Sequence, residues 1–454
     1  MFPDVNPGGR QRDFGGDESR LFCVGRSLRL PVPCPALPER RAMLEAYLME
    51  WGGMMLRWLH VITAIAWIGA SFFFIHLDAS LKPAEDIPPG TGGRAWQVHG
   101  GGFYEMRKYM VAPAVMPAEL TWHKWQSYWT WISGFFLLVW VYYAQSELYL
   151  IDPAVMQLSP FAAGAIGIAA LVIGWLIYDL LCKSPLGKHD VLLGLVGFGY
   201  VVAASWAFAN VFSGRGALIH TGALMATIMT ANVFFNIMPG QRKVIAALIA
   251  GEKPDPKYGK AAKQRSTHNN YITLPVLFLM LSNHYPVTYA NSSVIPLLVA
   301  LVIVSGALIR HFFNVRHGDH AKSPWWCWAV AILALWLAFW VAMSSSPGGR
   351  EQLGLKAWDA AKPVLLAGMT LPPVEVSNIV TGRCAMCHAP EPSWPGIQIA
   401  PKGVMLHEPE QIALHARAIR AQAVMTHAMP PNNLSGMTPA ERKTLAGWLA
   451  AAAR

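Results

Sequence analysis

Residues 160–182 read PFAAGAIGIAALVIGWLIYDLLC, an apolar run of 23 residues. An α-helix rises ~1.5 Å per residue, so about 20 such residues cross the ~30 Å hydrocarbon core of a bilayer. Eight runs of this kind lie along the chain. Their ranges are 54–77, 126–146, 160–182, 190–212, 217–238, 270–284, 293–313 and 325–345. The sequence therefore predicts an all-α, polytopic membrane helix bundle over residues 43–346, with about eight transmembrane helices in a lipid bilayer.

Composition supports a membrane protein. Hydrophobic residues make up 54% of the chain and charged residues only 14%, whereas soluble domains carry about 25% charged residues. The net charge of +10 is interpreted as a sign of membrane topology, because no phosphate-binding loop or nucleic-acid motif accompanies it. No nucleic acid is therefore expected as a partner. The sixth run, 270–284, is short and contains Pro275, so we expect it to be kinked or partly re-entrant.

Loop charges predict the direction of the helices. Sixteen Lys and Arg residues lie in one alternating set of loops, and Arg215 is the single one in the other set. The rich loops are 78–125, 183–189, 239–269 and 314–324. Cytoplasmic loops of membrane proteins are enriched in Lys and Arg. Both ends of the membrane domain are therefore predicted to lie outside the cytoplasm.

Residues 1–42 do not follow this charge pattern. They carry seven Arg on the predicted outer side, are rich in Pro and Gly, and hold no apolar run. They resemble neither a signal peptide nor a helix. Two interpretations remain, a disordered extension and a start codon placed too early. We favour Met43 as the true first residue, because starting there removes the excess of positive charge.

A short motif identifies the C-terminal domain. Cys384-Ala385-Met386-Cys387-His388 has the form C-x-x-C-H, the attachment site of a covalent haem c. Cys384 and Cys387 would bind the haem and His388 its iron. A structural zinc site would need a second ligand pair, and the chain has no other C-x-x-C. The sequence thus predicts a linker at 347–371 and a small class I cytochrome c domain with one haem c at 372–454.

Haem c is attached outside the cytoplasm in bacteria, so this domain is expected in the periplasm, in agreement with the loop charges. Helices are predicted near 374–381 and 409–422. A last helix should begin with Thr438 as N-cap, Pro439 at the first helical position and Glu441 as capping-box partner. Trp448 would lie on its apolar face. The whole chain is placed in the bacterial inner (cytoplasmic) membrane.

The second axial ligand of the iron is predicted to be Met429. Pro430 and Pro431 follow it, and prolines prevent helix formation, which favours an extended loop across the haem. A methionine ligand raises the reduction potential relative to two histidines. Four other residues compete for this role, namely Met405, Met425, Met437 and His427. His407 and His415 are expected at the surface.

Polar residues in the apolar runs are candidate catalytic residues. Ionisable groups inside a bilayer are functional candidates by default. His60 and His220 are expected near the outer face, where such a pair would hold a haem b or bind substrate. Asn232 and Asn236 share a helical face with His220, and Arg57 lies near a helix end. Helix–helix hydrogen bonding, and snorkelling of Arg57, are the alternative explanations.

The assembled chain resembles the bacterial membrane-bound urate hydroxylases (urate oxidases) that carry a C-terminal cytochrome c domain. The residues that carry the resemblance are Trp58-Leu59-His60-Val61, Ala66-Trp67-Ile68-Gly69-Ala70-Ser71-Phe72 and the motif at Cys384–His388, together with the eight-span layout. The resemblance covers about Met43 to Arg454.

This resemblance implies oxidation and hydroxylation of urate to 5-hydroxyisourate. Electrons would pass to the chain's own haem c and on to another cytochrome c or a terminal oxidase, without formation of peroxide. An alternative from another class is a membrane-anchored cytochrome c subunit of a quinol-linked respiratory complex, with no substrate site of its own.

Overall fold

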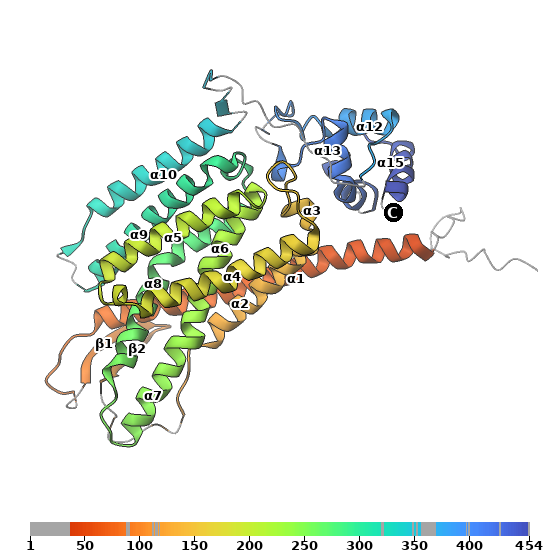
Figure 1. The fold of residues 1–454 in the computed structure, drawn as a ribbon. Coiled ribbons are helices and arrows are strands. Elements are labelled where there is room, and N and C mark those ends of the chain that lie inside the picture. Colours follow the sequence, from red (N-terminus) through yellow and green to blue (C-terminus); the bar gives the residue numbers. More distant parts are fainter. Residues whose placement is uncertain are drawn as a thin grey trace, which may run out of the picture. The chain divides into compact units, whose positions relative to one another are not determined.

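The part of the chain that the computed structural model describes is built almost entirely from helices (Figure 1). It comprises residues 37–87, 91–110, 113, 117, 119–318, 322–346, 349–350, 353–355, 369–395, 397, 400–425 and 428–452. The chain divides into two compact units, Met1–Glu50 and Trp51–Arg454. The predictions for 1–42 and for the linker at 347–371 fall mostly outside the described residues, although a helix already begins at Leu37.

Each predicted apolar run overlaps a helix before residue 346, whereas α3 and α7 correspond to no predicted run. The α-helices are α1 Leu37–Ser80, α2 Trp125–Leu138, α3 Ser146–Tyr149, α4 Pro160–Lys183, α5 Asp190–Ala209, α6 Gly214–Ala231, α7 Met238–Ile249, α8 Pro256–Ser282, α9 Ile295–Gly318 and α10 Trp326–Ser345. Two π-helical segments, η1 Val139–Tyr143 and η3 Asn232–Ile237, continue α2 and α6. Three short 3₁₀ turns complete this part, η2 Pro185–Lys188, η4 Pro286–Thr288 and η5 Ser292–Val294.

Six helical segments among the described residues are long and apolar enough to cross a membrane. They are Tyr47–Ser80, Pro160–Lys183, Asp190–Ala209, Gly214–Ile249, Ser292–Gly318 and Trp326–Ser345. A chain with several helices of membrane type is thereby confirmed. The second and sixth predicted runs are also helical, in α2–η1 and α8, but these two segments are not among the helices that are long and apolar enough to cross a membrane. The total of eight stays a prediction.

The helix α6 lies at the centre of this bundle. Nearly all of its side chains are buried, and α4, α5 and α8 are its neighbours (Figure 1). The helix α9 packs in turn on α5, α8 and α10. Since α6 is surrounded on several sides, its polar residues must find their partners within the protein.

The predicted boundaries of the sixth run were wrong. The expected inner loop 239–269 is largely helical, because α7 occupies 238–249 and α8 begins at Pro256. The Asp255 side chain caps α8 by accepting from the Lys257 backbone N–H at 2.9 Å. The helix then continues through Pro275 instead of re-entering. Gly306 of α9 makes room for the proline ring, since a Cβ there would lie 2.5 Å from Pro275 Cδ.

A β-hairpin is present in a chain that the sequence predicts to be all-α. Strands β1 Thr91–His99 and β2 Gly102–Tyr109 pair antiparallel, with His99 opposite Gly102. The connecting Gly100 and Gly101 have φ of 59° and 80°, the positive values that a two-residue hairpin turn requires. This segment had been predicted only as an inner loop.

The C-terminal domain is also helical. Its elements are α12 Val374–Cys384, η7 Pro401–Gly403, α13 Pro409–Leu414, α14 Ala416–Ile419, η8 Arg420–Met425, η9 Pro431–Asn433 and α15 Pro439–Ala452. The capping box of α15 is confirmed, because the Thr438 N–H donates to Glu441 Oε2 at 2.6 Å and the Glu441 N–H donates to Thr438 Oγ1 at 3.2 Å. Trp448 packs on the domain core, as predicted.

The predicted continuous helix at 409–422 was wrong, because it breaks at His415. This residue leaves helical geometry, with φ −97° and ψ 12°. The expectation that His415 is a surface residue was also wrong, since its side chain is buried. Burial lowers its pKa to about 4, so the imidazole is neutral near pH 7.

We predict that Gly306→Ala destabilises the protein by about 1–3 kcal/mol, because the new Cβ would overlap the Pro275 ring. Gly197→Ala is the matched control on α5, where an added Cβ meets nothing within 4 Å. That change should be neutral or stabilising by up to about 1 kcal/mol, since Ala favours helix over Gly. Thermal unfolding of the full-length protein in detergent measures both. Equal midpoints would contradict the close packing of α8 on α9.

Candidate functional site

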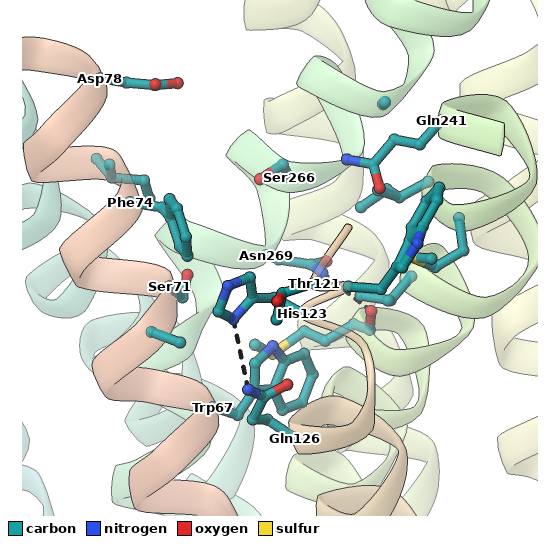
Figure 2. Close-up of a pocket in the computed structure, with 18 of the residues that line it drawn as sticks. Trp67, Ser71, Phe74, Asp78, Thr121, His123, Gln126, Gln241, Ser266 and Asn269 are labelled. Carbon is teal, nitrogen blue, oxygen red and sulfur yellow. Dashed lines mark hydrogen bonds between the residues drawn. The ribbon is translucent and has the colours of Figure 1, made fainter. Parts of the chain in front are cut away.

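A cavity of about 650 Å³ lies between α1, the segment at 120–126, η3, α7 and α8 (Figure 2). This volume is within the range of small-molecule sites, roughly 300–1,000 Å³. Apolar side chains form most of its wall. Several hydrogen-bonding side chains interrupt it, including Ser71, Thr121, His123, Gln126, Gln241, Ser266 and Asn269. The aromatic side chains are Trp67, Phe74, Trp122 and Tyr258.

Two side chains near the start of α2 define one wall of the cavity. His123 Nδ1 and Gln126 Nε2 are 3.5 Å apart, a long hydrogen bond. The His123 ring meets Phe74 of α1 edge to face, with 4.7 Å between ring centroids. Gln126 lines the cavity, and its Oε1 atom is buried with no hydrogen-bond partner among the described residues.

The opposite wall is backed by a buried ion pair. Arg265 of α8 donates to Asp179 of α4 at 2.8 Å, and both side chains are less than a tenth exposed. Arg265 also donates to Asn232 Oδ1 at 3.2 Å. The Asn232 amide donates to Tyr178 OH at 3.1 Å and to Asn269 Oδ1 at 3.0 Å. The network therefore ends at Asn269, which lines the cavity.

The π-helical segment η3 contributes some residues to the buried polar network and others to the cavity wall. Asn232, its first residue, faces Arg265 and Asn269. Val233 and Ile237 line the cavity instead, while Asn236 donates to Asp179 at 3.3 Å. Single-turn π segments occur frequently at functional sites. The extra residue in this turn lets η3 supply both the buried network and the cavity wall.

The structure brings Asn232 and Asn236 together but does not bring His220 to them. Both belong to one polar cluster, but His220 does not join it. His220 Nδ1 lies 2.8 Å from Gly216 O, and its Nε2 lies 3.2 Å from Tyr143 OH. A Cβ on Gly167 would come within 2.8 Å of the same nitrogen. His220 is therefore enclosed by α4, α6 and η1.

His60 and Arg57 lie apart from both groups. His60 Nδ1 is 3.0 Å from Thr130 O and 3.2 Å from Ser133 Oγ, both on α2. Within the described residues, no contact joins His60 to His220, and the two rings face different neighbours. The Arg57 side chain is exposed. None of these three residues lines the cavity.

The C-terminal motif begins at the last residue of α12, and a backbone carbonyl orients its histidine. His388 Nδ1 is hydrogen-bonded to Val404 O at 2.9 Å, which orients the ring and leaves Nε2 for a metal. Burial lowers the pKa of His388, which favours the neutral imidazole that binds iron. Burial also raises the pKa of the Cys384 thiol to about 12. Cys384 and Cys387 are both free thiols.

Met429 packs on the same apolar core as Cys384. Its backbone is held on both sides, since its N–H donates to Gln422 O at 2.8 Å and its carbonyl accepts from Arg442 at 3.0 Å. Of the competing ligands, Met437 is part of the buried core and Met405 is half-buried. His427 and the side chain of Met425 lie outside the described residues.

The environment of Trp448 bears on whether a haem fits the C-terminal domain. Its indole packs against the same apolar core as Cys384 and Met429, and its Nε1 is buried without a partner among the described residues. Buried N–H groups are almost always hydrogen-bonded, and an acceptor such as a haem propionate would satisfy this one. The residues present therefore fit a covalent haem c, which Cys384, Cys387 and His388 would hold. Met429 would supply the second axial ligand.

Sequence reasoning missed Asp179, Arg265, Gln126 and Asn269. Asp179 is the single charged residue in the apolar run 160–182, a signal that marks a functional or paired group in a membrane helix. Arg265 was counted among loop charges, because α8 was expected to begin after it. Gln126 and Asn269 carry no local signal, since only the packing of α1, α2 and α8 brings them to one cavity.

We predict that Asp179→Asn destabilises the protein by about 3–5 kcal/mol, because it leaves the buried Arg265 charge without its carboxylate. Lys183→Gln is the control. Lys183 contacts the same carboxylate, but its side chain is 63% exposed, so its loss should cost only ~0–1 kcal/mol. Thermal unfolding in detergent compares the two variants. A larger effect of Lys183→Gln would refute the assigned importance of the buried pair.

Comparison with known proteins gave one family match. The model described as urate oxidase N-terminal matches residues 46–342, about two thirds of the chain. The match covers α1 to α10, including every residue that lines the cavity, and it ends before the C-x-x-C-H motif. No curated protein and no solved structure matched the chain.

Proposed function

The chain belongs to the urate oxidase N-terminal family, and on this premise we propose that it oxidises urate to 5-hydroxyisourate and passes the electrons to its own haem c. The observation that carries the proposal is the joining of two parts in one chain. The family match spans the membrane-type helices, and a haem-attachment motif follows it. A substrate module and an electron acceptor are thus covalently linked.

The reaction balances with water as the oxygen source. Urate and one water give 5-hydroxyisourate, two protons and two electrons. Cys384, Cys387 and His388 would hold a haem c, which would supply one-electron acceptance, so each turnover would need two transfers. Dioxygen is not consumed at this step, and no peroxide forms. The electrons would continue to another cytochrome c or to a terminal oxidase.

The predicted location of the C-terminal domain supports delivery of the electrons outside the cytoplasm. Loop charges predict a periplasmic C-terminal domain, the compartment in which bacteria attach haem c. The enzyme would therefore lie in the inner membrane and deliver electrons on its outer side. His388, oriented by Val404 O, would bind the iron on one face and Met429 on the other. A methionine ligand raises the reduction potential, which suits an acceptor from urate.

The proposal predicts that urate reduces haem c in anaerobic membranes that contain the full-length protein. The absorption spectrum of haem c measures this, and mass spectrometry of the product made in ¹⁸O-water should show one labelled oxygen. A Cys384→Ser, Cys387→Ser double variant should lose covalent haem and urate turnover together. If urate leaves haem c oxidised while a quinol reduces it, the protein is a quinol-linked cytochrome and the proposal is wrong. A pyridine haemochrome assay on the same sample tests for haem b.

Met429 has a separate test. We predict that Met429→His keeps the covalent haem but lowers its midpoint potential by on the order of 0.1 V or more, because axial ligands tune haem over ~0.8 V. Met437→Leu is the control, since Met437 lies in the same core and is 2% exposed. Redox titration of the full-length protein measures both variants. A large change of the midpoint potential in Met437→Leu, with no change in Met429→His, would identify Met437 as the iron ligand.

A further inference from the structure

We propose that the cavity between α1, α2, η3, α7 and α8 is the urate site, with Gln126 as a residue that binds the purine. This inference rests on the proposed function and assigns it a place in the fold. None of the residues expected from the sequence, His60, His220 or Arg57, lines this cavity.

The first argument is the unused acceptor. Gln126 lines the cavity, and its Oε1 atom is buried without a hydrogen-bond partner among the described residues. Buried polar atoms are nearly always hydrogen-bonded, to the protein, to water or to a ligand. Urate carries several ring N–H donors next to carbonyl groups. A ring N–H placed against Oε1 would complete the hydrogen bonding of this side chain.

The second argument is a fixed donor across the cavity. One N–H of the Asn269 amide donates to Met229 O at 2.9 Å, and its Oδ1 accepts from Asn232 at 3.0 Å. These bonds set the orientation of the amide and leave one N–H free. That N–H suits a carbonyl oxygen of urate. The ion pair of Arg265 with Asp179 holds Asn232, so the donor is positioned before substrate arrives.

The third argument is shape. Trp67 and Phe74 of α1 line the cavity (Figure 2), and Trp122 is a further aromatic residue of its wall. A planar purine would stack on such a surface while its edge meets the amides. An apolar wall with a few convergent polar groups is the common composition of a small-molecule site.

The charges of the cavity wall indicate which type of interaction would bind urate. Among the described residues that line the cavity there is no Lys or Arg. Its one carboxylate, Asp78, is paired with Lys108 at 2.7 Å. Urate is a monoanion near pH 7, so without a side-chain cation in the wall the amide N–H groups would carry its recognition, and its binding should depend little on salt. Xanthine shares most of the N–H and C=O groups of urate and should compete.

Equilibrium dialysis of the purified full-length protein with radiolabelled urate, without an electron acceptor, tests the site. Gln126→Leu should weaken urate binding about tenfold or more, as expected for the loss of one hydrogen bond to a buried group. Gln145→Leu is the matched control, because Gln145 follows η1, outside the cavity. It should bind urate as the wild type does.

A second variant acts on the same cavity without removing a polar group. Ala262→Phe fills it from α8 and should also abolish urate binding, while dithionite still reduces haem c to the wild-type extent. If wild-type protein binds urate and both cavity variants bind it equally well, the site lies elsewhere and the inference fails alone. If the wild type neither binds urate nor is reduced by it, the proposed function fails as well.

Discussion

The ion pair between Asp179 and Arg265 is the interaction on which the membrane part of this protein depends. Each charge alone would be strongly unfavourable in a buried site, so the two must stay together. Their bond fixes α8 against α4 across 86 residues of sequence. Asn232 extends the contact into η3, and Asn269 extends it to the cavity. One electrostatic requirement thus sets the positions of three helical segments and one wall of the candidate site.

This arrangement has a consequence for electron flow. The cavity is lined by residues next to the positively charged loops, which the charge pattern predicts on the cytoplasmic side, whereas haem c is predicted outside. Electrons would then have to cross the membrane domain between the two sites.

The predictions that succeeded rest on local patterns. The capping box of Thr438 and Glu441 formed as expected, because its two hydrogen bonds span only three residues. Several errors were also local. The turn at Gly100-Gly101 signals a hairpin, and the lone Asp179 in an apolar run signals a buried partner. The sequence therefore contains a local signal for the hairpin and another for the ion pair, although neither was predicted.

By itself, the sequence determined that this chain has several membrane-type helices, because a bilayer requires long apolar runs that can be recognised without any partner. It also determined the haem-attachment motif, since two cysteines and a histidine within five residues define that chemistry locally. Only the tertiary structure decided which polar residues meet. Gln126 comes from α2 and Asn269 from α8, and their place in one cavity depends on packing between helices more than 100 residues apart. Neither their spacing nor their residue type carries that information.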